Sequence, residues 1–219
     1  MEALRGKNFE KPIMCNLYDI GPTRRKPRTA FEAAALELIP ELPRLFGIRK
    51  TDTGLVVKKG RAGYEAETMR WGFSRDFNSA INNTRDDKLN GTMWRKAFRE
   101  RRCLVPVAAF YEWTGPKGYK QAHVVRSPED SDWLWCAGLW EMHREYGPCY
   151  SMITTTSPPW MAKIHSRVIA LFNDLPTAAK YLETENPREL LAPPEPLEII
   201  RCENPLKSKQ PGPPTVILP

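Results

Sequence analysis

Closely spaced, short strand-like runs are the feature that most restricts how this sequence can fold. They are rich in β-branched and aromatic residues and are often bounded by Gly or Pro. Six of them occur: Leu55–Lys59, Glu65–Trp71, Leu104–Trp113, Ala122–Arg126, Trp133–Glu141 and Cys149–Thr155. The chain between them is too short for the crossover helices of a parallel sheet. The sequence therefore predicts an α+β fold: a single domain with a mostly antiparallel β-sheet or open barrel at its core and a few peripheral helices.

Helices are predicted at three places around this core. Thr29 and Glu32 form a capping box that begins an Ala/Leu-rich helix, which Pro40 should end. The spacing of apolar residues predicts two further helices, over residues 94–101 and 174–182.

Both ends of the chain differ from its middle. Residues 1–13 show no pattern that would pack, and we expect them to be an extension missing from the active protein, because translation begins after it or because it is cut off. Eight of the 21 prolines follow Leu191, which predicts an extended strap. Within it, residues 197–200 could pair as a strand and residues 206–219 form a flexible Pro-rich tail. The domain itself is predicted to span residues 14–205.

Composition and charge exclude several classes of protein. The 219 residues carry 33 Lys and Arg against 26 Asp and Glu, a net charge of +7, and 41% are hydrophobic, which is typical of a globular chain. No apolar run approaches the roughly 18 residues that span a bilayer, and the first residues lack the apolar core of a secretory signal. We therefore expect a cytoplasmic monomer with no membrane partner, whose charge weakly favours a polyanion.

The placement of cysteines and histidines gives no support for a metal or an organic cofactor. The five cysteines are widely dispersed and form no CxxC pair, and the three histidines lack the spacing of metal ligands. The sequence therefore predicts reduced thiols, no metal site and no cofactor.

The pair Met14-Cys15 is the first candidate for chemistry. If translation begins at Met14, this methionine is removed before a small residue and Cys15 becomes the N-terminal residue. Its α-amine, with a pKa of about 8, and its thiol then form a 1,2-aminothiol. This group condenses with an aldehyde to an imine, which the thiol closes to a thiazolidine; no internal cysteine can do so. The alternative is a buried cysteine at the start of a strand.

Three further places carry polar residues in unusual settings. Glu112 is flanked by aromatic residues, and partial loss of water should raise its pKa towards the range of general acid–base catalysis. The alternative is a strand glutamate that faces solvent. His165 is either a proton shuttle or a structural residue. Asn82 and Asn83 are either positioning amides or part of a turn.

Basic residues gather in two runs, at residues 24–28 and 95–102, and Arg70-Trp71 places a cation beside an aromatic ring. Single-stranded nucleic acid binding requires cations for phosphates and aromatic faces for bases. Solvated helix faces would account for each run taken alone.

Taken in order, these segments resemble the SRAP (SOS response-associated peptidase) family of abasic-site processing proteins. The matching pieces are Met14–Tyr18, Arg70–Phe73, Asn83–Arg85, Phe98–Pro106, Phe110–Trp113, Ala137–Trp140, Thr154-Thr155 and His165–Arg167. No one piece is decisive, but their order along the chain is specific. One departure is that the family's Cys-Gly-Arg opening is here Cys15-Asn16-Leu17, so an arginine contact is missing.

The resemblance implies covalent capture of the aldehyde of an abasic site in single-stranded DNA, at the nucleoid during the response to DNA damage. Cys15 would be the nucleophile, while Glu112 and His165 would move protons. Asn83, or the neighbouring Asn82, would hold the main chain of the cysteine. The residues expected to meet DNA are Arg70, Trp71, Arg85, Arg102 and Arg167, with Trp71 stacking on or wedging bases.

Other functions stay open at this point. The same imine could support lyase activity at abasic sites, as the family implies. A cysteine peptidase would use Cys15 as thiolate and His165 as base, and would cleave its own Met14–Cys15 bond. A non-covalent module for single-stranded nucleic acid would use the same basic and aromatic residues.

Overall fold

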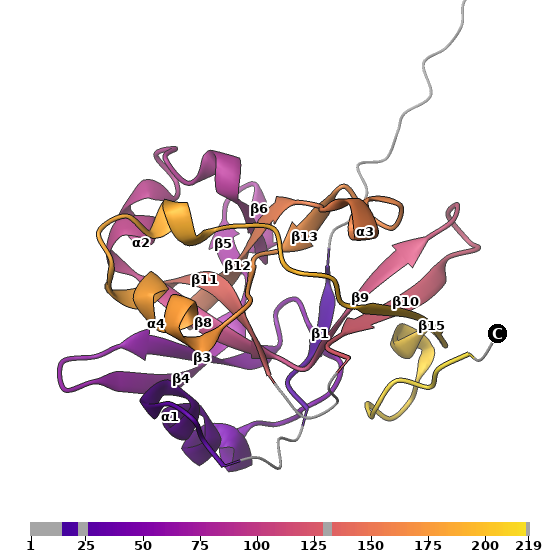
Figure 1. The fold of residues 1–219 in the computed structure, drawn as a ribbon, viewed down its shortest axis with the longest axis horizontal. Coiled ribbons are helices and arrows are strands. Elements are labelled where there is room, and N and C mark those ends of the chain that lie inside the picture. Colours follow the sequence, from indigo (N-terminus) through magenta and orange to yellow (C-terminus); the bar gives the residue numbers. More distant parts are fainter. Residues whose placement is uncertain (1–14, 22–25, 129–132, 218–219) are drawn as a thin grey trace, which may run out of the picture.

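The structure is a computed structural model that describes residues 15–21, 26–128 and 133–217 (Figure 1). Two large β-sheets and short helices form one domain, which confirms the predicted α+β fold with a mostly antiparallel core. Among the described residues, no helix is both long and apolar enough to cross a membrane. The predicted extension, residues 1–13, lies outside the described residues.

The larger sheet contains a closed barrel. Its five strands are β3 (Thr53–Lys59), β4 (Tyr64–Trp71), β8 (Arg102–Val107), β11 (Leu134–His143) and β12 (Gly147–Thr156). Neighbours in the order β4-β3-β8-β11-β12 are antiparallel, and the ring closes because β12 also pairs with β4 in parallel, with Tyr150 opposite Trp71. The same sheet carries three short strands: β7 (Asn83–Arg85), β13 (Arg167–Ile169) and β14 (Leu171–Phe172).

The second sheet is antiparallel and lies beside the barrel, on the right in Figure 1. Its strands, in spatial order, are β15 (Glu198–Cys202), β10 (Gln121–Arg126), β9 (Ala109–Thr114), β1 (Leu17–Asp19) and β2 (Ile48–Arg49). Phe110 and Val125 belong to the main core, whereas the adjacent Tyr111 and Val124 belong to a smaller apolar cluster. Both faces of this sheet are therefore covered.

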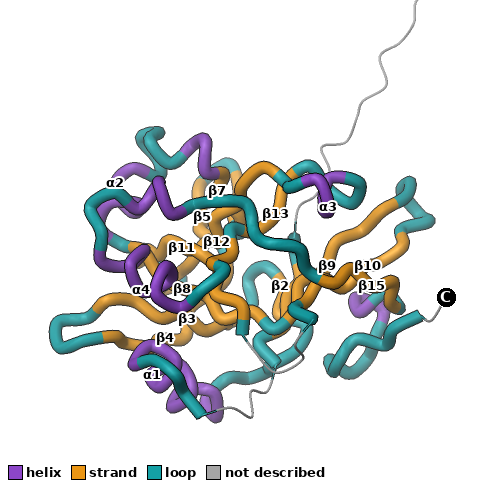
Figure 2. The backbone as a smooth tube through the Cα atoms, in the orientation of Figure 1, coloured by secondary structure: helices purple, strands orange, loops and turns teal. Residues whose placement is uncertain are grey.

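The helices lie around the barrel, as Figure 2 shows. Helix α1 (Ala30–Leu38) packs against β3 and β4, and its N-cap Thr29 accepts a hydrogen bond from the main-chain N–H of Glu32, as the capping box predicts. The other helices are α2 (Arg95–Glu100), α3 (Pro159–Ala162) and α4 (Leu175–Glu183). Single 3₁₀ turns occupy Ile39–Glu41, Asp86–Lys88, Pro187–Leu190 and Pro205–Lys207, and strands β5 (Phe73–Arg75) and β6 (Asn78–Ile81) form a separate hairpin.

The run predicted as one strand over residues 104–113 is two strands. Val107 ends β8 in the barrel and Ala109 begins β9 in the second sheet. Between them, the main-chain N–H of Ala108 donates to the carbonyl of Asp19 at 2.8 Å. The chain therefore changes sheets at this one residue, and this change brings β9 alongside β1.

The C-terminal strap folds back over the second sheet. The strand predicted at residues 197–200 is β15, and Cys202 forms a bridge with Val216. The N–H of Glu203 donates to Thr215 and that of Ile217 to Arg201, at 2.9 and 2.8 Å. Main-chain hydrogen bonds thus join the described part of the tail to the strand before it, and the flexibility expected of residues 206–219 stays a prediction.

Candidate active site

Cys15 lies just before β1, and its main chain is held from two sides. Its N–H donates to Oε1 of Glu112 at 2.9 Å. Its carbonyl accepts from the side-chain amides of Asn82 and Asn83, at 3.0 and 2.9 Å. The sequence left open whether Asn82 or Asn83 holds the cysteine, and in the structure both do.

Two strand pairings bring these residues together from distant parts of the sequence. Strand β1 pairs antiparallel with β9, with Tyr18 opposite Phe110, and this register places Cys15 within reach of Glu112. Strand β7 runs parallel to β12, which fixes Asn83 opposite Met152 at the rim of the barrel. The site therefore lies where the second sheet meets the barrel.

Burial controls the protonation of the site. Glu112 is 1% exposed, and burial raises its pKa to about 8, against the opposing effect of the hydrogen bond from Cys15. Burial, and then the nearby charge of Glu112, raise the pKa of the Cys15 thiol well above its ordinary value. Its Sγ donates to the carbonyl of Leu17 at 3.5 Å. At neutral pH the carboxyl can therefore give or take a proton, and the thiol is neutral.

Three of the residues predicted to be catalytic each present a buried polar atom with no hydrogen-bond partner among the described residues. These atoms are Oε2 of Glu112, Oδ1 of Asn83 and Nε2 of His165. An unsatisfied buried polar atom costs about 1–3 kcal/mol. Trp135, Ser157 and Arg167 also carry such atoms, so the feature is not confined to these three residues. On a functional candidate, an unsatisfied atom indicates a place where a polar group of a bound molecule would be received.

His165 lies just before β13 and is 7% exposed. Its Nδ1 lies 3.0 Å from both the main-chain N and the main-chain O of Arg167, which fixes the ring through one neighbouring residue. The free Nε2 is the atom through which this ring could exchange a proton.

Arg102 and Arg167 have structural partners within the protein. The guanidinium of Arg102 donates to the carbonyls of Tyr181, Leu182 and Thr184, at and just after the C-terminal end of α4, and to two carbonyls of α2. Arg167 is 9% exposed and forms an ion pair with Asp86 at 2.6 Å. Contact of either arginine with DNA stays a prediction, although Arg102 donates to several main-chain carbonyls and Arg167 pairs with Asp86, while Nε of Arg167 has no partner among the described residues.

Trp71 is fully buried, and its expected stacking on or wedging of bases stays a prediction. Its indole lies 5.0 Å, edge to face, from Tyr18 and stacks parallel to Tyr150 at 6.3 Å. Its Nε1 donates to the carbonyl of Asn82 at 2.9 Å. The tryptophan thus supports the asparagine that holds Cys15.

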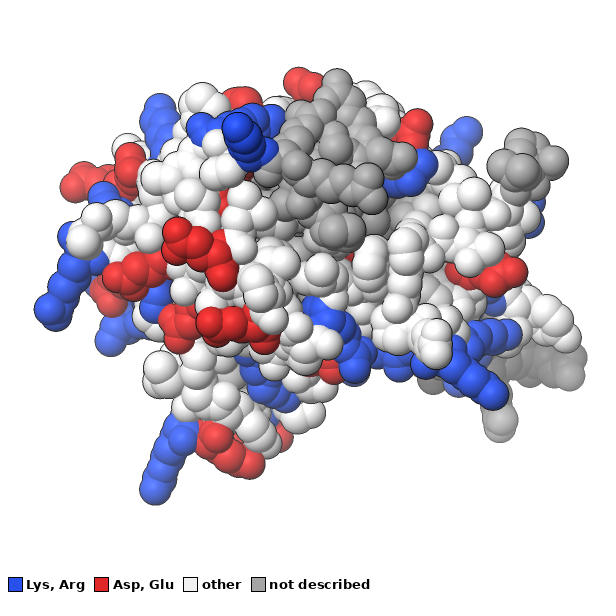
Figure 3. All heavy atoms as spheres, turned by 90° about the horizontal axis from the view of Figure 1, so that it is seen from below, with Lys and Arg blue, Asp and Glu red and all other residues white. Residues whose placement is uncertain are grey.

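Arg70 and Arg85 are more open. Arg85 is exposed and pairs with Asp87 at 2.7 Å, while Arg70 is half-buried, donates to Ser79 and lies 4.6 Å over the ring of Tyr146. Contact of these two with DNA stays a prediction. Figure 3 shows both Lys and Arg and Asp and Glu on this face, with several basic side chains together along its lower right edge.

No group of three or more metal-ligating side chains occurs among residues 15–21, 26–128 and 133–217. The sequence reasoning missed one polar pair close to the site. Tyr111, next to Glu112, donates its hydroxyl to buried Asp19 at 2.6 Å. No sequence signal pointed to it, because Asp19 ends the short strand β1 and no local pattern shows that it is buried.

Comparison with known proteins identifies the family. A family model described as SOS response associated peptidase (SRAP) matches residues 14–205. The chain belongs to the SRAP family. The resemblance carried by the ordered motifs is thereby confirmed, and the family name links this SRAP protein to the response to DNA damage and to peptidase-like chemistry.

Solved structures share the fold of this SRAP protein. A protein from Bordetella bronchiseptica has a TM-score of 0.68 at 18% identity, over 87% of this chain and 100% of its own. A protein from Bacteroides thetaiotaomicron has a TM-score of 0.65 at 16% identity, over 80% and 86%. A phage-related protein from Bordetella bronchiseptica has a TM-score of 0.65 at 17% identity, over 87% and 95%.

Proposed function

We propose that this protein captures the aldehyde of an abasic site in single-stranded DNA as a covalent thiazolidine on Cys15. The observation that carries the proposal is the buried Glu112 carboxyl on the main-chain nitrogen of Cys15. In an internal cysteine this nitrogen belongs to a peptide bond, and a group that accepts or donates protons has no catalytic use beside it. An N-terminal cysteine would have its α-amine at that position, where a carboxylate can remove the proton that blocks attack on a carbonyl.

The first step requires Cys15 to be the N-terminal residue, through a start at Met14 or through cleavage of the Met14–Cys15 bond. Glu112 takes a proton from the ammonium, and the freed amine adds to the aldehyde carbon to give a carbinolamine. A proton returned by Glu112, or supplied by Nε2 of His165, lets the hydroxyl leave as water. The product of this step is an imine.

The second step closes the ring. The Cys15 thiol adds through sulfur to the imine carbon, its proton passes to the imine nitrogen, and a five-membered thiazolidine results. The overall change is the loss of one water, with no oxidant or reductant. The neutral thiol suits this sequence, because the amine attacks first and the sulfur adds only to the activated imine.

The raised pKa of the Cys15 thiol argues against the peptidase with a thiolate nucleophile. The asparagines and Arg85 serve the capture reaction in different ways. Asn82 and Asn83 hold the carbonyl of Cys15, so that amine and thiol face one carbon, and Arg85 supplies a cation for a phosphate.

The test compares chains that begin at Met14, with Cys15 or with the substitution Cys15→Ala, after incubation with abasic single-stranded DNA. We expect the wild-type chain to gain the mass of the oligonucleotide less one water, in a bond that survives denaturation. The Cys15→Ala chain keeps the α-amine and should be joined to DNA only when a borohydride reduces the imine. Cys149→Ala is the matched control and should react like the wild type.

Two results would overturn the proposal. One is an adduct of Cys15→Ala that forms without reductant. The other is binding by the wild-type chain that falls with salt and leaves no covalent product, which would support the non-covalent module.

A further inference from the structure

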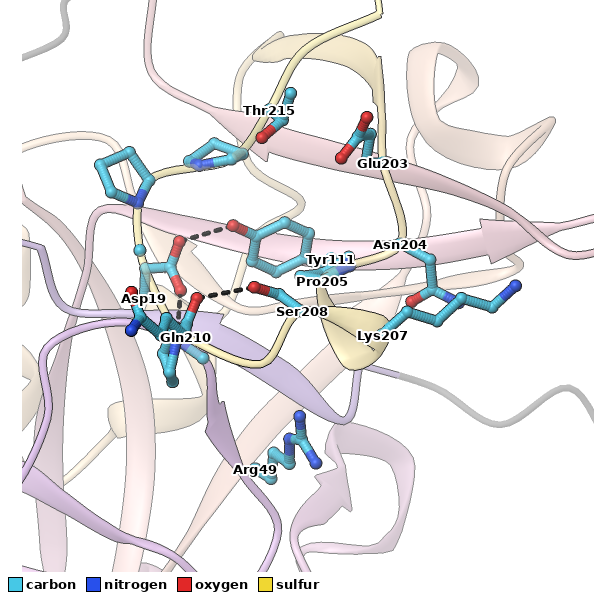
Figure 4. Close-up of a pocket in the computed structure, with 15 residues that line it drawn as sticks. Asp19, Arg49, Tyr111, Glu203, Asn204, Pro205, Lys207, Ser208, Gln210 and Thr215 are labelled. Carbon is cyan, nitrogen blue, oxygen red and sulfur yellow. Dashed lines mark hydrogen bonds between the residues drawn. The ribbon is translucent and has the colours of Figure 1, made fainter.

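A cavity of about 470 Å³ lies on the side of the second sheet that the C-terminal strap covers, in the volume range of small-molecule sites (Figure 4). Residues 203–215 of the strap form most of its wall. Tyr111 and the prolines of the strap give it an apolar part. This cavity plays no part in the proposed capture of DNA.

Asp19 is the unusual group in this cavity. It is 1% exposed, accepts from the hydroxyl of Tyr111 at 2.6 Å and accepts from the main-chain N–H of Gly47 at 2.7 Å. Burial raises its pKa to about 6, so the carboxyl is still ionised at neutral pH. No described residue forms an ion pair with it, although buried charges in proteins are normally paired.

The opposite charge stands on another side of the same cavity. Arg49 and Lys207 line it, and neither forms an ion pair with a described residue. Figure 4 shows the guanidinium of Arg49 directed from β2 towards the space beneath the strap. Glu203, a strap residue that also lines the cavity, adds a second carboxylate. The cavity thus offers an unneutralised anion, an unneutralised cation and an apolar wall.

We propose that this cavity, the strap pocket, binds a small zwitterion of the α-amino acid class with an apolar side chain. The ammonium group lies against Asp19, the carboxylate against Arg49, and the side chain against Tyr111 and the prolines of the strap. Binding of a metal ion in the strap pocket has no support, because among the described residues Asp19 and Glu203 belong to no group of three or more potential metal ligands.

The test is calorimetric titration of the full chain with L-leucine and L-phenylalanine. Two analogues of leucine are the critical controls: 4-methylpentanoate lacks the ammonium and isopentylamine lacks the carboxylate. We expect saturable binding of at least one amino acid and about tenfold weaker binding of each analogue, the size of effect of one charge-assisted contact. Absence of saturable binding by both amino acids, or equal binding of the analogues, overturns the proposal.

Variants locate the site. Asp19→Asn and Arg49→Gln should each weaken binding about tenfold, whereas Asp76→Asn and Arg61→Gln, which alter exposed residues outside the pocket, should not. If Asp19→Asn fails to fold, Arg49→Gln alone decides, and unchanged binding by it overturns the proposal. Capture of abasic DNA by Arg49→Gln should stay at the wild-type level. Ligand binding and DNA capture are therefore measured independently, and either proposal can fail without the other.

Discussion

The main-chain nitrogen of Cys15 lies 2.9 Å from a carboxyl oxygen of Glu112, although the two residues are 97 positions apart. Strand pairing alone brings them together, and both are 1% exposed. In the proposed mechanism, a carboxyl group in this position exchanges a proton with the nitrogen that becomes an amine when Cys15 is the N-terminal residue.

Replacement of Glu112 by Gln should slow adduct formation by about 10²- to 10⁴-fold. The amide oxygen can still accept from the nitrogen of Cys15, but no proton can be carried. The measurement is the single-turnover rate of adduct formation on a chain that begins at Met14. Glu65→Gln, at an exposed strand position, is the control and should react normally. If the Glu112→Gln variant formed the adduct at the wild-type rate, the carboxyl group of Glu112 would have no role in the mechanism.

Stability should fall as pH rises through the range in which Glu112 titrates. Its folded pKa of about 8 is higher than the ordinary value of 4.5, so the native state holds the proton that the unfolded state has already lost. The contribution is complete below about pH 4.5 and is lost as pH approaches 8, at no more than about 1.4 kcal/mol per pH unit. Urea unfolding of the chain that retains residues 1–14 measures it. The slope should be smaller in Glu112→Gln, and equal slopes would contradict the raised pKa.

Trp71→Phe should destabilise the fold by about 2–3 kcal/mol, because it removes buried volume and the hydrogen bond to the carbonyl of Asn82. Adduct formation should slow at the same time, since Asn82 loses its support. Urea unfolding and the single-turnover rate measure the two effects. A base-stacking tryptophan would behave differently: its replacement would weaken DNA binding and leave stability unchanged.

Arg85→Gln should weaken binding of single-stranded DNA and reduce the slope of log affinity against log salt by about 1, with a stability change within about 0.5 kcal/mol. Arg102→Lys should do the reverse. A lysine cannot donate to all the carbonyls of α2 and α4 that accept from Arg102. The Arg102→Lys variant should therefore be about 2 kcal/mol less stable than the wild type and keep the wild-type salt slope. Fluorescence anisotropy over a salt series, with urea unfolding, separates the two. An unchanged slope in Arg85→Gln would exclude its phosphate contact.

Local signals predicted the parts of the fold that depend on neighbouring residues. Thr29 caps α1 through Glu32, three positions away, and α1 ends at Leu38, before Pro40. The division at Ala108 depends instead on a partner far along the chain, since its N–H is used by Asp19. No local pattern shows when a continuous apolar run will change from one sheet to another.

The same limit applies to the candidate site. Cys15 and Glu112 could be named from residue type and chemistry, but alternation cannot show that both Tyr111 and Glu112 are buried, because β9 is covered on both faces. Arg102 belongs to a basic run, yet most of the carbonyl groups to which it donates lie at or just after the C-terminal end of α4, far along the chain. Which arginines are free depends on these distant carbonyls, and the sequence does not display them.

The parallel pairing that closes the barrel also determines when the site forms during folding. Trp71 meets Tyr150, and Asn83 meets Met152, across a long stretch of intervening chain. Because pairings between residues far apart in the sequence form slowly, we expect this closure to be a late event. Until β12 is in position, the side-chain amides of Asn82 and Asn83 have no fixed place beside the carbonyl of Cys15. We expect a nascent or half-folded chain to lack the organised aminothiol, so that reactivity towards aldehydes appears only with the finished barrel.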